Sequence, residues 1–196
     1  SGIQGILESQ KEEANQVFSK FYENHYEDWL HGNEDNIPTL SHTLLRDKLF
    51  PFLNDDIPTY FILIDNLRYD QWKTLQPLIE EYYTTELDDV YYGIIPSATQ
   101  YARNALFSGL MPNEIKKKYP EYWIDEHEEE TKNKYEEQLL GEMLKRFGKS
   151  DISLSYNKIL NLNAGRKLVE KLPNLLNNKL NVIVYNFIDT LSHART

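Results

Sequence analysis

Two apolar runs that each end in an aspartate constrain the fold of this chain more than any other feature. The first run covers residues 60–64 and is followed by Asp65, and the second covers residues 181–188 and is followed by Asp189. Short apolar runs separated by helical patterns are typical of parallel strands that are buried on both faces. The sequence therefore predicts an α/β fold with a mostly parallel sheet and helices on both of its faces.

The sequence around these runs supplies the other elements of such a fold. We expect helices at 3–31, 41–50, 68–81, 99–108, 132–147 and 164–178, strands at 59–65, 151–155 and 181–188, an extended stretch at 82–92 whose tyrosines pack a strand face, and a surface insertion at 113–131. The predicted organisation is a helical linker segment at 1–57, followed by an α/β domain at 58–196. The chain lacks an initiator Met and ends just after an expected helix start, so we expect a piece of a longer protein.

The amino-acid composition limits the metal ligands, the cellular location and the binding partners that are expected for this chain. The chain contains no Cys, so any metal must be held by oxygen and nitrogen, and a reducing, cytoplasmic location is expected. The net charge of −10 argues against binding to duplex DNA or to an anionic membrane surface. No apolar stretch approaches the roughly 20 residues of a membrane-spanning helix.

Four side chains form the candidate metal set, beginning with the two aspartates that follow the apolar runs. Carboxyl ends of parallel strands meet at one edge of a sheet, where ligands bind. His193 follows Asp189 by four residues, so on a helix the two side chains share a face. Oxygen and nitrogen ligands suit zinc, and manganese is an alternative. In the simpler interpretation Asp189 caps a helix beside a surface His193, and Asp65 or Asn66 caps the next helix.

Thr99 is the fourth candidate, at the predicted start of a helix. Unpaired backbone N–H groups at such a position favour a phosphate, and a threonine hydroxyl becomes nucleophilic when a base or a metal activates it. The alternative is that Ser97 or Thr99 is an ordinary helix cap. Arg68 and Arg103 are the nearest cations in the sequence and are candidates for holding a substrate phosphate, although a solvated surface role is the alternative for each.

Together these motifs resemble the alkaline phosphatase superfamily, and within it the PglZ domain. The residues that carry the resemblance are the apolar strand with Asp65-Asn66-Leu67-Arg68-Tyr69-Asp70, then Pro96-Ser97-Ala98-Thr99 with Leu106-Phe107-Ser108-Gly109-Leu110-Met111-Pro112, and Asp189-x3-His193. The resemblance covers roughly residues 58–196. The amphipathic segment before it is similar to the helical linker of PorX-type response regulators, in which a receiver domain precedes the helices.

The resemblance implies a site for two zinc ions. Asp65 and Thr99 would contribute to one zinc, with Thr99 also the nucleophile, and Asp189 and His193 would contribute to the other. In the family each zinc has further ligands later in the chain, usually an Asp-His pair and a final His. This sequence has no adjacent Asp-His pair. Either the remaining ligands lie beyond Thr196 or the site is degenerate.

The implied function is a zinc-dependent phosphodiesterase or phosphatase that serves as the output domain of a two-component response regulator. Its substrate would be phosphorylated or nucleotide-like, including short oligonucleotides, and its partner a sensor kinase or another signalling protein. This part of the chain alone would be inactive. The alternative is a non-catalytic PglZ-like module that binds a partner protein and forms a homodimer through the N-terminal helices.

Overall fold

The computed structural model describes residues 2–54, 57–124 and 133–186, which belong to two compact units, Ser1–Thr39 and Leu40–Thr196. The first unit consists mainly of the predicted long helix, α1 (Gly2–His31), which is confirmed. Gly32 follows it with a φ of 73°, a left-handed conformation that suits glycine after a helix end. The indole N–H of the buried Trp29 donates to Glu34 Oε2 at 2.9 Å, so the turn after the helix packs back on its last residues.

The second unit contains the predicted parallel sheet, which is confirmed. Among the described residues its strands are β1 (Thr59–Ile64), β2 (Leu154–Ile159) and β3 (Leu180–Tyr185), in the spatial order β1-β3-β2, with both pairings parallel. The strand expected at 151–155 begins three residues later. Because β3 lies between the other two strands, its residues 180–184 are all buried, which explains the unbroken apolar run.

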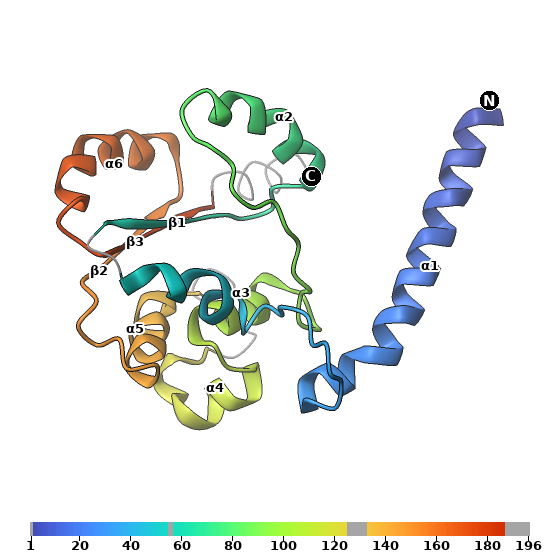
Figure 1. Cartoon of the computed structure of the whole chain (residues 1–196), viewed down its shortest axis with the longest axis horizontal. Helices are drawn as coiled ribbons and strands as arrows, with labels where there is room; N and C mark the ends of the chain where they lie inside the picture. Colours follow the sequence, from blue (N-terminus) through green and yellow to red (C-terminus); the bar gives the residue numbers. More distant parts are fainter. Residues whose placement is uncertain (1, 55–56, 125–132, 187–196) are drawn as a thin grey trace. The chain divides into compact units, whose positions relative to one another are not determined.

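Helices cover both faces of this sheet, as the sequence predicts. They are α2 (Tyr69–Glu80), α3 (Thr99–Ser108), α4 (Pro112–Lys118), α5 (Glu136–Arg146) and α6 (Leu162–Leu175), with shorter helical turns at Leu45–Leu49, Phe50–Asn54 and Pro120–Tyr122. Figure 1 shows α6 and α2 on one side of the sheet and α3, α4 and α5 on the other. In the region of the helix expected at 41–50, helical turns begin at Leu45 and continue through Pro51 to Asn54.

The two faces of β3 divide the apolar core into two clusters. Leu180, Val182 and Val184 face the larger cluster, which includes Phe107 of α3 and Met143 of α5. On the other face, Ile183 packs in a smaller cluster with Ile159, Leu168 and Leu175. Successive side chains of a strand point to opposite faces of the sheet. Every second residue of each strand therefore lies beneath α3 and α5.

Two expectations about the connecting segments are wrong. Residues 82–92 form no strand, apart from a single bridge between Tyr92 and Leu40, and Tyr82 and Tyr83 are 80% and 73% exposed. Aromatic residues favour a strand only where a neighbouring strand and a packed face are present, and this stretch has neither. The described part of the 113–131 segment is also more than a surface insertion, because Ile115 and Tyr119 are buried in the larger core cluster.

Candidate functional site

The carboxyl edge of the sheet brings Asp65 beside Asn186. Asp65 directly follows β1, and its backbone N–H donates to the carbonyl of Tyr185 at 3.1 Å. Asn186 directly follows β3, and its N–H donates to the carbonyl of Ile159 at 2.9 Å. These bonds extend the strand register, so the side chains of Asp65 and Asn186 leave the sheet at the edge where open α/β folds bind ligands.

The guanidinium of Arg103 in α3 joins these two residues. Its Nη1 donates to Asp65 Oδ2 at 2.9 Å and to Asn186 Oδ1 at 2.8 Å. Its Nε and Nη2 donate to the two carboxylate oxygens of Glu136, at 2.7 and 2.6 Å. Arg103 is 5% exposed and Glu136 is fully buried, so the solvated position considered for Arg103 is wrong. Arg103 instead links α3, α5 and the ends of two strands.

Two residues of β2 complete this group by contacting Glu136. The hydroxyl of Tyr156 donates to Glu136 Oε2 at 2.5 Å, and the ammonium of Lys158 lies 3.5 Å from the same oxygen. We call the group the Arg103 cluster; it comprises Asp65, Arg103, Glu136, Tyr156, Lys158 and Asn186. It contains two side chains that are formally cationic and two that are formally anionic, so its formal charges cancel, as buried ionic groups require.

The electrostatics of the cluster favour the charged guanidinium of Arg103 and the neutral hydroxyl of Tyr156. Burial lowers the pKa of Arg103, but the Glu136 and Asp65 carboxylates outweigh burial, and the net shift is upward. Burial, followed by the Glu136 charge, raises the pKa of Tyr156 well above its usual value, so its hydroxyl remains a donor. Burial lowers the pKa of Lys158, and the nearby Glu136 offsets only part of this effect.

Thr99 is the first residue of α3 and is exposed. The N-cap residue is Ala98, and no side-chain cap is present among the residues that the structure describes, so the alternative in which Ser97 or Thr99 caps this helix is wrong. An uncapped helix N-terminus offers backbone N–H groups and a positive dipole end to an anion. Thr99 and Arg103 are four residues apart, so they share a face of α3, about 6 Å apart along its axis. Thr99 therefore lies about one helical turn before Arg103, the residue whose guanidinium contacts Asp65.

Asp65 does not cap the helix that follows it. The N-cap residue of α2 is Arg68, whose backbone N–H donates to Gln71 Oε1 at 3.0 Å. Asn66 adopts a φ of 61°, which turns the chain away from the sheet before α2 begins. The capping alternative is therefore wrong for both Asp65 and Asn66, and the Asp65 carboxylate faces Arg103 instead.

Arg68 is solvated, in contrast to Arg103. Its side chain is 67% exposed, and its guanidinium donates to both carboxylate oxygens of Asp70, at 2.9 and 2.8 Å. Such a side chain is free to rearrange toward an incoming phosphate, whereas the buried guanidinium of Arg103 is already committed to its carboxylate partners.

The donors present fit a zinc or manganese ion in their chemistry. Asp65 Oδ2 accepts from Arg103, whereas Oδ1 accepts no hydrogen bond from any described residue, so one oxygen remains for a cation. Asp189 and His193 lie outside the described residues. Within residues 2–54, 57–124 and 133–186, no three His, Asp or Glu side chains gather as a metal site.

Sequence reasoning missed Glu136, Tyr156, Lys158 and Asn186, although a signal was present for three of them. Tyr156 and Lys158 are spaced by two, and Asn186 continues the period of Val182 and Val184, so each lies on the strand face beneath α3 and α5. Glu136 carries no such signal, because a Glu in the first turn of a helix is normally solvated.

Comparisons with known families match two regions of the chain. The family model of the BREX system PglZ alkaline phosphatase-like domain matches residues 44–196, and that of the PorX response regulator linker domain matches residues 1–30. No curated protein matches the chain. Among the described helices, none combines the length and the apolar character needed to cross a membrane.

Proposed function

Because the chain belongs to the PglZ family of alkaline phosphatase-like domains, we propose that it forms a metal-dependent phosphoric ester hydrolase with Thr99 as nucleophile. One observation carries the proposal. Thr99 stands at an uncapped helix N-terminus, one turn from Arg103, which holds Asp65 at the ligand-binding edge of the sheet. A hydroxyl, a carboxylate and unpaired backbone N–H groups are the groups that a phosphoryl-transfer site needs on the protein side.

Two zinc ions fit the residues proposed for the site. Asp65 and Thr99 would hold one, and Asp189 and His193 the other, with manganese as the alternative metal. When bound, the metals would lower the pKa of the hydroxyl and neutralise the charge that develops on the phosphate. The ligands are oxygen and nitrogen only, which suits both metals.

The protein's own groups account for the remaining chemistry. The N–H groups at the start of α3 bind the phosphate oxygens, and Arg103 fixes the Asp65 carboxylate. Thr99 Oγ forms a bond to phosphorus and gives up its proton to water, while the ester oxygen departs with its electron pair and takes up a proton from water. Water then cleaves the phospho-threonine and restores the hydroxyl. Arg68, exposed near the same edge, is the residue proposed to steady the outer phosphate oxygens.

The substrate proposed is a small phosphodiester or phosphomonoester, including nucleotides and short oligonucleotides. A net charge of −10 disfavours long polyanions, whereas bound cations reverse the field within one cleft. The linker match at residues 1–30 supports a role as the output domain of a two-component response regulator, with a sensor kinase or another signalling protein as partner, in the cytoplasm.

Metal content and phosphodiesterase activity of the full-length protein test this function. We expect about two zinc ions per chain and hydrolysis of bis-p-nitrophenyl phosphate, with Thr99→Ala reducing kcat by roughly a thousand-fold or more. Ser97→Ala is the matched control, because it removes an exposed hydroxyl two residues earlier and should leave kcat unchanged. A metal-free, inactive full-length protein, or a Thr99→Ala variant with wild-type kcat, would contradict the proposal.

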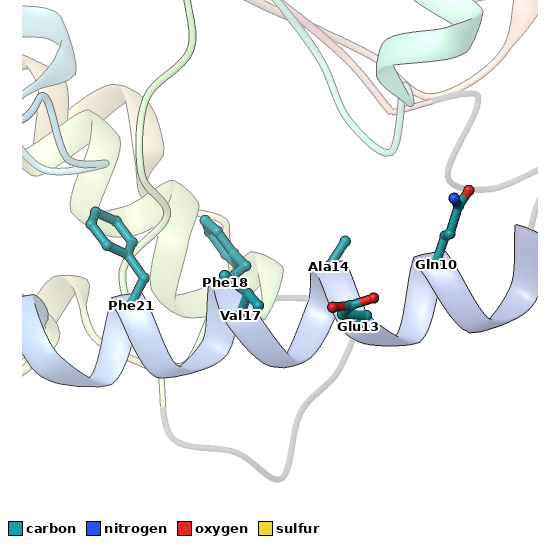
Figure 2. Close-up of a pocket in the computed structure, with 6 residues that line it drawn as sticks. All are labelled: Gln10, Glu13, Ala14, Val17, Phe18 and Phe21. Atoms are coloured by element: carbon teal, nitrogen blue, oxygen red, sulfur yellow. The ribbon is translucent and has the colours of Figure 1, made fainter.

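A second candidate function, a non-catalytic module that forms a homodimer, is favoured by one face of α1. Its residues 3, 7, 10, 14, 17 and 21 are spaced alternately by four and three, the spacing of a coiled-coil seam. Most of this face is apolar, and Ile3, Leu7 and Val17 are 76%, 60% and 65% exposed. Figure 2 shows the middle of the face, where Ala14, Val17, Phe18 and Phe21 follow one another along the helix.

The partner proposed for this face is α1 of a second copy of the chain. Val17→Glu should convert a dimer to a monomer in sedimentation equilibrium, because it buries a charge in the seam. Ser19→Glu, on the opposite face of α1, is the control and should leave the mass unchanged. A monomeric wild type would exclude this interface, and a dimeric but metal-free and inactive protein would favour the docking module over the enzyme.

A further inference from the structure

We propose that Glu136 is a positioning residue for the metal ligand Asp65, acting through Arg103 rather than through any contact with substrate. This inference rests on the proposed function, since it concerns the metal held by Asp65. It adds a buried residue of α5 that lies outside the sequence motifs carrying the PglZ resemblance, 71 positions beyond Asp65 in the sequence.

The planar geometry of the guanidinium transmits the effect. Glu136 accepts hydrogen bonds from Nε and Nη2 of Arg103, which are two corners of one rigid plane. Fixing these two corners fixes the third, Nη1, in position and orientation. Nη1 is the atom that donates to both Asp65 Oδ2 and Asn186 Oδ1. Glu136 therefore sets where the ends of β1 and β3 present their side chains.

Glu136 is itself held in place from another direction. It is the first residue of α5, where the helix dipole favours a negative charge, and its Oε2 accepts from the hydroxyl of Tyr156 in β2. Lys158, also in β2, lies 3.5 Å from the same oxygen. The carboxylate is thus anchored to one helix and one strand that do not carry the proposed metal ligands.

The fixed guanidinium of Arg103 places the two carboxylate oxygens of Asp65 in different environments. Arg103 occupies Oδ2, while Oδ1 has no hydrogen-bond partner among the residues of known position, so the carboxylate is oriented with one oxygen toward the ligand edge. Residues that hydrogen-bond a metal ligand directly, as Arg103 does with Asp65, typically change metal affinity by about 10–100-fold when they are altered. Because Glu136 fixes the guanidinium of Arg103, we expect its loss to have an effect within that range.

A purely structural role for Glu136 makes a different prediction. If the ion pair served only to join α3 to α5, its loss would lower stability and leave the zinc affinity of the folded protein unchanged. The test must therefore measure metal binding by folded protein, apart from catalysis.

The experiment is a Zn²⁺ titration of the full-length protein against a competing chelator. Glu136→Gln should weaken Zn²⁺ binding by about 10–100-fold. Where that variant folds poorly, Arg103→Met with Glu136→Leu replaces both charges by apolar groups and should weaken binding similarly. The decisive measurement is a double-mutant cycle with Asp65→Asn: when Asp65 is already altered, Glu136→Gln should have little further effect.

Two controls separate positioning from general loosening of the fold. Glu142→Gln removes a carboxylate of the same helix whose ion-pair partner among the described residues is the surface Lys145 alone, and Leu168→Ala loosens the core cluster on the opposite face of the sheet. Both should retain wild-type Zn²⁺ affinity. Unchanged affinity in Glu136→Gln, or effects that add fully with Asp65→Asn, would overturn the inference while leaving the proposed function intact. A wild type without bound metal would overturn both.

Discussion

Arg103 in α3 and Glu136 in α5 form a buried ion pair through two hydrogen bonds of 2.7 and 2.6 Å. The two residues are 33 positions apart, and Glu136 is fully buried. Removing two charges from water is costly, and a pair of this kind is stable only when other polar groups satisfy the remaining donors and acceptors. Here Asp65, Asn186 and Tyr156 provide those partners.

Breaking this pair should destabilise the fold more than replacing it. Glu136→Gln leaves the guanidinium of Arg103 without its charge partner, and we expect a loss of about 3–5 kcal/mol in the free energy of unfolding. Arg103→Met combined with Glu136→Leu should lose much less, because neither charge then needs a partner. Urea denaturation checks both variants, and a double variant less stable than Glu136→Gln would contradict this account.

Gly109 should tolerate alanine less well than Gly148. Both glycines end helices with positive φ, 64° and 68°, so alanine strains each backbone by about 1 kcal/mol. A Cβ at Gly109 would also lie 2.6 Å from Cε of the buried Met143, whereas no neighbouring atom of the described residues lies within 4 Å of a Cβ at Gly148. We expect Gly109→Ala to cost about 1–3 kcal/mol more than Gly148→Ala in thermal or urea unfolding. Equal losses would mean that Met143 moves aside at no cost.

Asn181 should contribute to stability through its side-chain amide. It is fully buried in β3, and its Nδ2 donates to the carbonyl of Leu175 at the end of α6, at 2.9 Å. Asn181→Ala removes this link between helix and strand, and we expect a loss of about 1–3 kcal/mol in the free energy of unfolding. Asn177→Ala, at an exposed position, is the control and should change stability by less than about 0.5 kcal/mol.

His42 should make the fold sensitive to mild acid. Burial lowers the pKa of His42 below the usual histidine value of about 6.5, and its Nδ1 is buried without a hydrogen-bond partner among the described residues. As the pH drops below about 6.5, His42 binds a proton more readily in the unfolded chain than in the folded protein. The free energy of unfolding therefore falls as the pH drops below that value. His42→Gln should lose less stability than wild type between about pH 7.5 and pH 5. His31→Gln, at an exposed histidine, should behave as wild type. Identical pH profiles for wild type and His42→Gln would refute this assignment.

Arg68 should affect substrate binding without affecting the fold. Within the described part of the chain its exposed guanidinium pairs only with the neighbouring Asp70, so Arg68→Ala should unfold as wild type does. If Arg68 binds the substrate phosphate equally in the ground and transition states, the variant should raise KM for a phosphodiester and leave kcat unchanged. Lys73→Ala removes an exposed cation from the same helix, one that pairs with Asp88, and should leave KM unchanged. A similar KM for both variants and the wild type would exclude this role of Arg68.

The sequence determined the elements of this fold because their signals are local. The alternation of apolar strands and amphipathic helices predicted the parallel sheet and its covering helices, and Gly109 and Gly148 marked the ends of α3 and α5. Placing Asp65 at the carboxyl edge of the sheet also needed only the strand pattern, because parallel strands end on the same side. The PglZ-like motifs depend on the same local order along the chain.

Only the tertiary structure decided which charges are buried together. Arg103 looked like a surface cation, because arginine is usually exposed and nothing near it in sequence indicates a partner. Its partners Glu136 and Asn186 lie 33 and 83 residues away, and they meet it only when α3, α5 and two strands pack on the same face. Helix and strand periods reveal which face a residue occupies, but the choice of partner across a core depends on the packing of the whole unit.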